Sequence, residues 1–311
     1  MKPNKLYVTG NGFDLHHGIA SSYNNFKEYV KSHDNELYES IDTYLPIDKW
    51  WSDLEESFAY IDVDNIAESA LDFLRSYNSE DWSDSYHHDY QFEVSRVINL
   101  LSVKLVERFS EWIFKLEIPT QEELSIVPLL LDKNATYFSF NYTETLINTY
   151  GINDDQILYI HGKVEDECSD IVLGHAWEPK EIPSLNSYVE PENIDARIME
   201  GNDILDSYFG NTFKPISSLI QANTEYFSSL SEVSEVYVLG HSLSEVDIEY
   251  FVNIAKSINR SATWVVSYYG ANELEHHKSV ISKLGIPSNR AVYFELSSGI
   301  PKLNKSSKKD A

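Results

Sequence analysis

Short apolar runs alternate with longer amphipathic stretches along much of this chain. The runs are rich in β-branched and aromatic residues, which is typical of strands buried on both faces of a sheet. They lie at residues 5–9, 135–140, 157–160, 170–173, 235–239, 263–268 and 291–296. Helix-length stretches separate several of them, and this alternation favours parallel strands joined by right-handed crossovers. The sequence therefore predicts an α/β fold with a doubly wound, mostly parallel, Rossmann-like sheet.

The segment from residue 30 to residue 131 follows a different pattern, because it shows 3.6-residue periodicity and no convincing strand. One apolar stripe passes through Val94, Val97, Leu101, Leu105, Phe109, Trp112 and Leu116. A second passes through Ile66, Ala70, Phe73 and Tyr77. We therefore expect a helical insertion or lid subdomain over residues 30–131, and a Rossmann-like nucleotide-binding domain formed by residues 1–29 and 132–311. A further helical stretch is expected over residues 195–231. The tryptophan-bearing segments 50–56 and 82–84 fit either a cap over a site or the starts of surface helices.

The charge balance narrows the range of partners. Of the 311 residues, 50 are acidic and 24 are basic, which gives a formal charge of −26. Nucleic acids and anionic membranes require clustered Lys and Arg, so general nucleic-acid binding and membrane binding are not expected. The single cysteine, Cys168, cannot form an internal disulfide or a Cys-based zinc site. With no long apolar run and no signal-peptide core, the expectation is a soluble cytoplasmic protein.

A glycine-rich turn follows the first predicted strand. The turn and the residues behind it that can serve a ligand are Gly10, Asn11, Gly12, Phe13, Asp14 and Gly18. Glycine lets a phosphate approach backbone N–H groups, and the start of the following helix carries a partial positive charge. The G-x-G-x5-G spacing differs from the dinucleotide fingerprint, and no acidic residue follows a second strand at the usual distance. The turn therefore predicts either an anion site or tight strand–helix packing.

Three other segments come at or just beyond the carboxyl ends of predicted strands, where open α/β sheets bind ligands. Their candidate residues are Asn141 and Tyr142, His161 and Gly162, and Gly240, His241 and Ser242, with Asp247 further on. An asparagine can position a ribose or a water, and an imidazole can exchange protons with either near neutral pH. Helix capping by Asn141 with Glu144, or by Ser244 with Asp247, would need no ligand, and a lone histidine is more often structural. No metal is expected, because the histidines near these turns lack metal-binding spacing.

Taken in order, the segments at residues 10–19, 22–26, 140–143, 160–162 and 239–243, with Asp247, resemble the AbiH family of bacterial abortive-infection proteins. AbiH proteins in turn resemble the sirtuin-like fold. That resemblance implies that NAD or a related nucleotide is the substrate or ligand, that Asn141 orients ribose or water, and that His161 is the catalytic base. The implied reaction is hydrolysis of the nicotinamide–ribose bond during phage defence. The zinc cysteines of sirtuin deacetylases are absent from the sequence, which disfavours protein deacetylation.

The chemistry expected from these residues is coherent. Cleavage of an N-glycosidic bond develops oxocarbenium character on the ribose, which Asp14 or Asp247 can stabilise while His161 deprotonates water. A nucleotide-binding sensor or scaffold without turnover is the alternative, and a nuclease is a third reading that the charge disfavours. The expected partner is a nucleotide-sized small molecule. A phage-derived trigger and a homo-oligomer are left open by the sequence.

Overall fold

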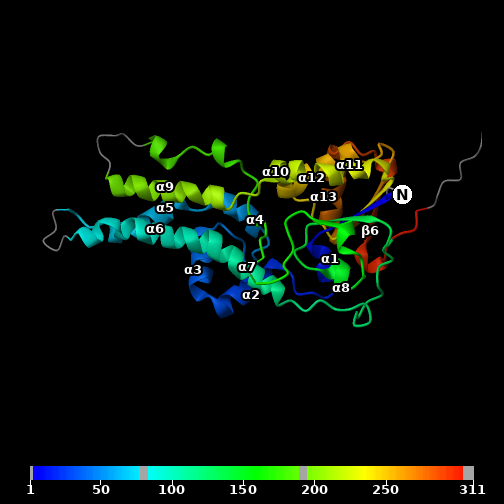
Figure 1. Cartoon of the computed structure of the whole chain (residues 1–311), viewed down its shortest axis with the longest axis horizontal. Helices are drawn as coiled ribbons and strands as arrows, with labels where there is room; N and C mark the ends of the chain where they lie inside the picture. The colour runs from blue at the N-terminus through cyan, green and yellow to red at the C-terminus, as the bar shows by residue number, and fades with distance from the viewer. Residues whose placement is uncertain (1–2, 78–82, 168, 189–194, 304–311) are drawn as a thin grey trace, which may run out of the picture. The chain divides into compact units, whose positions relative to one another are not determined.

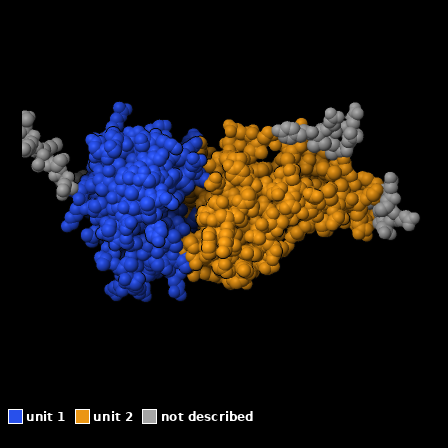
Figure 2. Space-filling view, turned by 180° about the vertical axis from the view of Figure 1, so that it is seen from behind, with its two compact units in different colours: residues 1–20, 117–160, 220–311 blue, residues 21–116, 161–219 orange. Residues whose placement is uncertain are grey.

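The computed structural model describes residues 3–77, 83–167, 169–188 and 195–303. The chain forms two compact units, which Figure 2 colours separately. Unit 1 comprises residues 1–20, 117–160 and 220–311, and unit 2 comprises residues 21–116 and 161–219. Cys168 and Trp82 lie outside the described residues.

A six-stranded parallel sheet forms the centre of unit 1 (Figure 1). Its strands are β1 (Lys5–Thr9), β2 (Thr136–Ser139), β3 (Ile157–Tyr159), β4 (Glu235–Leu239), β5 (Thr263–Tyr268) and β6 (Ala291–Glu295). They are arranged in the order β3-β2-β1-β4-β5-β6, and every neighbouring pair is parallel. This is the strand order of the doubly wound nucleotide-binding fold. The chain adds strands on one side of β1 as far as β3 and then on its other side from β4 onward, so the switch point lies between β1 and β4. The predicted α/β fold with a parallel, Rossmann-like sheet is confirmed.

The prediction of a strand at residues 170–173 is wrong, because this segment is irregular and belongs to unit 2. Ile171 and Leu173 are buried, as the apolar pattern requires. The N–H of Val172 donates to the carbonyl of His161 instead of to a strand of the sheet. A short apolar run shows that a segment is buried but not that it pairs with a sheet.

One face of the sheet carries a row of stacked tyrosines. Tyr7 of β1 lies in register with Tyr137 of β2 and Tyr237 of β4. The ring centroids are 5.2 Å apart for the first pair and 4.8 Å apart for the second, and both pairs are stacked. The same apolar cluster includes Phe13 of α1 (Asn11–His16) and Leu146 of α8 (Thr145–Asn148).

Helices also cover the opposite face, because successive side chains of a strand point to opposite sides. Phe138 follows Tyr137 in β2, and its ring centroid lies 5.9 Å from that of Phe227 and 6.0 Å from that of Tyr250. The helices of unit 1 after β3 are α11 (Thr224–Ser229), α12 (Ile248–Ser257) and α13 (Gly270–Lys283). The sheet therefore has helices on both faces, as a doubly wound fold requires.

Unit 2 consists mainly of helices, with irregular chain over much of residues 161–188 (Figure 1). Its main helices are α2 (Tyr23–His33), α3 (Asn35–Tyr44), α4 (Leu54–Ser57), α5 (Val63–Ala70), α6 (Asp89–Asn99), α7 (Leu105–Phe114), α9 (Ala196–Asn211) and α10 (Ile216–Ala222), whose last residues belong to unit 1. A π-helical turn at Leu100–Lys104 joins α6 to α7. The first predicted stripe is confirmed from Val94 to Trp112, where every member is buried. The second stripe is wrong at Phe73 and Tyr77, which are exposed because α5 ends at Ala70.

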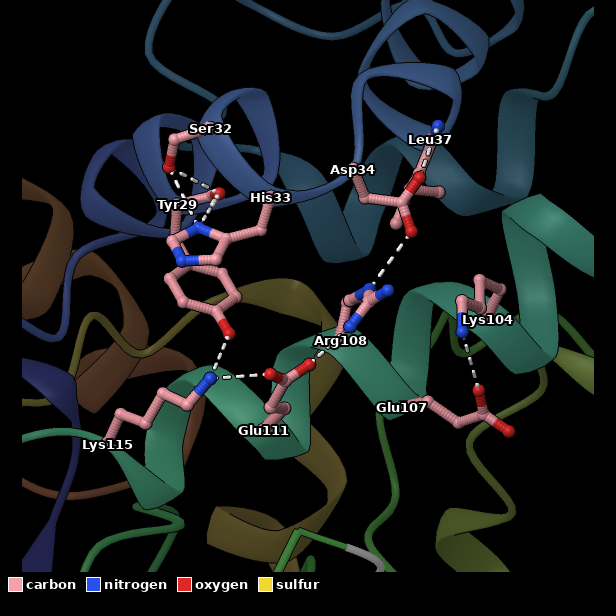
Figure 3. A network of polar contacts seen from close by, with 10 residues as sticks. All are labelled: Tyr29, Ser32, His33, Asp34, Leu37, Lys104, Glu107, Arg108, Glu111 and Lys115. Carbon is pink, nitrogen blue, oxygen red and sulfur yellow. Dashed lines mark hydrogen bonds and ion pairs between the residues drawn. The ribbon is translucent and has the colours of Figure 1, made fainter.

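A charged network ties the turn between α2 and α3 to α7 (Figure 3). Arg108 of α7 donates to Asp34, which caps α3, at 2.9 Å, and to Glu111 at 2.5 Å. Glu111 also accepts from Lys115 at 2.5 Å, and Lys115 donates to the Tyr29 hydroxyl at 2.9 Å. The Lys115 ammonium lowers the pKa of Glu111 to about 2. The network fixes how these helices meet.

The two units divide the chain differently from the expected insertion over residues 30–131. Residues 161–219 group with the helical segment, and α9 packs along α6. One contact between them is the bond from the Gln91 side chain to Glu200, at 2.8 Å. The expected helical stretch at 195–231 is therefore shared between unit 2 and unit 1.

Candidate functional site

The loops behind β1 and β4 meet at the switch point of the sheet and touch through their backbones. The N–H of Gly10 donates to the carbonyl of Leu239 at 3.1 Å, and that of Gly12 donates to the carbonyl of Gly240 at 2.7 Å. These two amides are therefore used inside the protein. A phosphate at this turn would need donors other than the Gly10 and Gly12 amides.

Glycine is required at this contact because the two backbones leave no room for a β-carbon. A β-carbon on Gly12 would lie 2.8 Å from the Gly240 carbonyl oxygen, and one on Gly10 would lie 2.8 Å from the Cα of His241. Gly240 has a φ of +65°, and a β-carbon there would lie 2.0 Å from the nitrogen of Phe13. These contacts give the glycines a packing role. Nucleotide binding by residues 10–13 and by Gly240 stays a prediction.

Asp14 lies on α1 directly behind this turn and is only 2% exposed. One carboxylate oxygen accepts from the Thr143 hydroxyl at 2.6 Å, and the other accepts from the Thr145 hydroxyl at 2.7 Å. Burial raises the pKa of Asp14 to about 6, although hydrogen bonds from Thr143, Thr145 and Asn141 act in the opposite direction. Asp14 thus fastens α1 to the loop that follows β2, and contact with a substrate stays a prediction.

Asn141 lies in that loop after β2 and is almost fully buried, as is its neighbour Tyr142. The N–H of Asn141 donates to the Ser139 hydroxyl at 3.2 Å. The next helix begins only at Thr145, with Glu144 at its N-cap, so Asn141 does not cap it. Asn141 is therefore not the helix cap, but its side chain hydrogen-bonds the Asp14 carboxylate, which is a structural role that needs no ligand. Its contact with ribose or water stays a prediction.

The loop after β4 is held in one conformation by its own histidine and by β5. The Nδ1 atom of His241 accepts from the N–H of Leu243 at 2.9 Å. Leu243 has a φ of +53°, which is uncommon for a residue with a branched side chain. The N–H of Gly240 donates to the Ser267 hydroxyl at 2.8 Å, and the carbonyl of Ser242 lies 3.2 Å from a ring nitrogen of His277. Unusual backbone held this firmly is common where a fold binds a ligand.

Asp247 faces His241 across this loop. Because Nδ1 of His241 accepts a hydrogen bond, the ring proton lies on Nε2, which is 3.5 Å from a carboxylate oxygen of Asp247. The same oxygen accepts from the Ser244 hydroxyl at 3.4 Å. α12 begins at Ile248, and the Asp247 side chain makes no capping bond to it. The Ser244–Asp247 contact exists, but Asp247 also pairs with the imidazole of His241.

His161 and Gly162 follow β3 and open unit 2. His161 is buried, and its carbonyl accepts from the N–H of Val172 at 2.9 Å. Gly162 has a φ of +83°, and a β-carbon there would lie 2.7 Å from the Asp170 carbonyl oxygen. The glycine is therefore needed for the sharp turn, and the catalytic role of His161 stays a prediction.

The end of α1 is anchored by a buried hydrogen-bonded chain. Nδ1 of His17 donates to the Phe13 carbonyl at 2.6 Å, and the Tyr150 hydroxyl donates to Nε2 of His17 at 2.6 Å. The Tyr150 oxygen in turn accepts from the N–H of Leu129 at 3.2 Å. Burial lowers the pKa of His17 to about 4, so the ring is neutral as this pattern requires. Gly18 then leaves the helix with a φ of +79°.

Several residues that fix this edge of the sheet carry no signal in the sequence. Thr143 and Thr145 stand 129 and 131 positions from Asp14, and Ser267 stands 27 positions from Gly240. Such hydroxyls are recognised only when the fold brings them to their partners.

Metal ligands and membrane-spanning helices were sought among the residues that the structure describes. No group of three or more His, Cys, Asp or Glu side chains in that part of the chain could hold a metal ion. None of its helices has both the length and the apolar character needed to cross a bilayer.

Comparison with known proteins gives one result. A search of curated proteins finds no match to this chain. The family model described as bacteriophage abortive infection AbiH matches residues 6–268, a span that includes the loops after β1, β2, β3 and β4. The expected family is confirmed: the chain belongs to the AbiH family of bacteriophage abortive infection proteins.

Proposed function

We propose that this abortive-infection protein hydrolyses NAD, or a related nucleotide, at the N-glycosidic bond. The observation that carries the proposal is the β3-β2-β1-β4-β5-β6 order, which sets the loops after β1 and β4 on either side of the switch point. Doubly wound sheets bind nucleotides at this point. The loop with Asn141 follows β2, the strand next to β1.

The roles proposed for the carboxylates differ. Both oxygens of Asp14 accept from threonine hydroxyls, so Asp14 acts as a positioning residue for the loop that carries Asn141. Asp247 is less enclosed and pairs with His241, so it is the better candidate to stabilise an oxocarbenium ion. His161 is proposed to deprotonate the attacking water, while nicotinamide leaves without acid assistance.

Release of nicotinamide from NAD by the purified full chain tests this proposal. We expect wild type to release nicotinamide, and Asn141→Ala and His161→Ala to release at least about a hundredfold less, as is usual when a catalytic group is removed. Asn148→Ala, on the exposed side of α8, and His88→Ala, at an exposed position of unit 2, are the matched controls and should retain full activity. Equal activity of all four variants would refute the assigned roles.

A nucleotide sensor without turnover is the second candidate, and one observation favours it. Both oxygens of the Asp14 carboxylate accept from threonine hydroxyls, so one of the two carboxylates expected to act on the ribose is used inside the protein. A sensor would be stabilised against heating by ADP-ribose or NAD but would release no nicotinamide.

A further inference from the structure

Tyr269 is the most exposed large apolar residue in the described part of the chain. It is 92% exposed, so both faces of its ring are open to solvent. A single exposed aromatic is ordinary on a protein surface, and exposure by itself indicates no site. What sets Tyr269 apart is its place in unit 1, at the edge of the sheet where the candidate site lies.

Tyr269 follows β5 directly and stands at the N-cap of α13. β5 pairs in parallel with β4, and Val266 lies opposite Val238 in the register. Gly240 and Tyr269 follow this pair closely, so both chains leave the sheet at its carboxyl edge. β4 borders the switch point, and β5 is the next strand, about 5 Å farther along the sheet. Tyr269 is therefore carried by the strand next to the loop after β4.

Hydrogen bonds join the loop after β4 to β5 and α13, the two elements that meet at Tyr269. The Ser267 hydroxyl, in β5, accepts from the N–H of Gly240 at 2.8 Å. His277 of α13 lies between the two segments. One of its ring nitrogens is 3.1 Å from the Ser267 carbonyl oxygen, and the other is 3.2 Å from the Ser242 carbonyl oxygen. The loop after β4 and the corner at Tyr269 are therefore held together.

The backbone at this corner is fixed, whereas the space beside it is open. The N–H of Tyr269 donates to a carboxylate oxygen of Glu273 in the first turn of α13. A β-carbon built on Gly270, the next residue, would meet no atom within 4 Å. The corner therefore leaves room for a flat ligand, and binding there would require little ordering of the backbone.

The charged residues on the first turns of α13 and at the end of β6 disfavour a phosphate at this corner. Glu273 lies in the first turn of α13, and Glu295 ends β6, the strand beside β5. Glu275 and Lys278 pair with each other at 2.7 Å, and a ring nitrogen of His276 lies 3.1 Å from a backbone carbonyl. Carboxylates thus outnumber the lysine, so an uncharged flat ring fits the corner better than a phosphate.

We propose that Tyr269 is the stacking platform for the adenine base of the nucleotide. The inference rests on the proposed function, in which a nucleotide binds at the switch point between β1 and β4. A nucleotide whose ribose or phosphate lies there can extend its base one strand further, to the corner after β5. Stacking on an aromatic ring needs neither a charge on the base nor a fixed hydrogen bond. An adenine nucleotide would then contact the loop after β4 and Tyr269 together.

Calorimetric titration of the full chain with ADP-ribose tests the platform without any turnover. We expect Tyr269→Ala to raise the dissociation constant about tenfold, as is usual for the loss of one base–aromatic stack. Tyr269→Phe keeps an aromatic ring and should stay within about twofold of wild type. Ribose 5-phosphate has no base, so its dissociation constant should be the same in wild type and in Tyr269→Ala.

Phe92→Ala is the matched control, because Phe92 is 69% exposed on α6 in unit 2 and lies outside the sheet. This variant should bind ADP-ribose as wild type does. Tyr269→Ala should keep the wild-type melting temperature, and its tenfold effect should persist at high salt because the base is uncharged. Failure of wild type to bind ADP-ribose, equal affinity of wild type and Tyr269→Ala, or an effect that vanishes at high salt would overturn the proposal.

Nicotinamide release from NAD is measured separately, so the platform and the proposed hydrolysis can fail independently. Binding of ADP-ribose that depends on Tyr269, with no release from NAD, would uphold the platform and refute hydrolysis. Release with the same KM in wild type and Tyr269→Ala would uphold hydrolysis and refute the platform. A raised KM in Tyr269→Ala with an unchanged melting temperature would uphold both.

Discussion

Replacing Gly12 with alanine perturbs the contact between the loops after β1 and β4 and nothing else. The new β-carbon would lie 2.8 Å from the Gly240 carbonyl oxygen and 2.9 Å from the Gly240 Cα, and backbone cannot swing aside as a flexible side chain can. Separating the loops also lengthens the bond from the Gly12 N–H to the Gly240 carbonyl, now 2.7 Å. Overpacking costs about 1–3 kcal/mol, the lost hydrogen bond about 1, and alanine recovers about 0.5–1 by restricting the unfolded chain. The expected net loss of stability is about 2 kcal/mol.

Urea denaturation followed by circular dichroism measures this loss, and two other glycines separate its causes. Gly210 lies in α9, and a β-carbon added there would have nothing within 4 Å, so Gly210→Ala should stabilise the protein by about 0.5 kcal/mol. Gly18 also has open space but a φ of +79°, so Gly18→Ala should cost about 1 kcal/mol through backbone strain alone. A Gly12→Ala protein as stable as Gly210→Ala would show that the two loops do not need to touch.

Three further changes probe polar groups that hold the fold together. The raised pKa of Asp14 means that its carboxyl binds a proton more tightly when folded, so its effect favours folding increasingly as pH falls through about 6. Lowering the pH from 7 to 5 should therefore stabilise wild type by about 1 kcal/mol relative to Asp14→Asn, and parallel pH profiles of unfolding would contradict this. Tyr150→Phe removes the hydrogen-bond partner of Nε2 of His17 and should lower the free energy of unfolding by about 2–3 kcal/mol. An unchanged melting temperature would show that the hydrogen bonds joining Phe13, His17, Tyr150 and Leu129 are dispensable. Arg108→Ala should cost about 1 kcal/mol, less in high salt, while Lys104→Ala, in an exposed pair, should stay within about 0.5 kcal/mol.

The parallel sheet could be predicted from the sequence because its strands are buried on both faces and therefore form continuous apolar runs. Residues 235–239 and 263–268 are typical, and β4 and β5 occupy those positions. The run at 170–173 has the same apolar character but is buried by irregular packing against the turn at His161 and Gly162. Periodicity reports burial, so it could not separate these two cases.

The candidate site could be predicted only as a set of loops. The sequence placed Gly12 and Gly240 after strands, but their backbone contact and the use of the Gly12 amide depend on two segments more than 200 residues apart. The enclosure of Asp14 by Thr143 and Thr145 depends on the same kind of long-range placement.

The central claim is that one nucleotide binds at the carboxyl edge of the sheet in unit 1. Hydrogen–deuterium exchange of the full chain with and without ADP-ribose tests it most directly, because each loop reports separately. The account predicts slower exchange in residues 10–18, 140–143 and 240–247 when the nucleotide is present. Unchanged exchange in all three loops at saturating ADP-ribose, or protection confined to other parts of the chain, would contradict it.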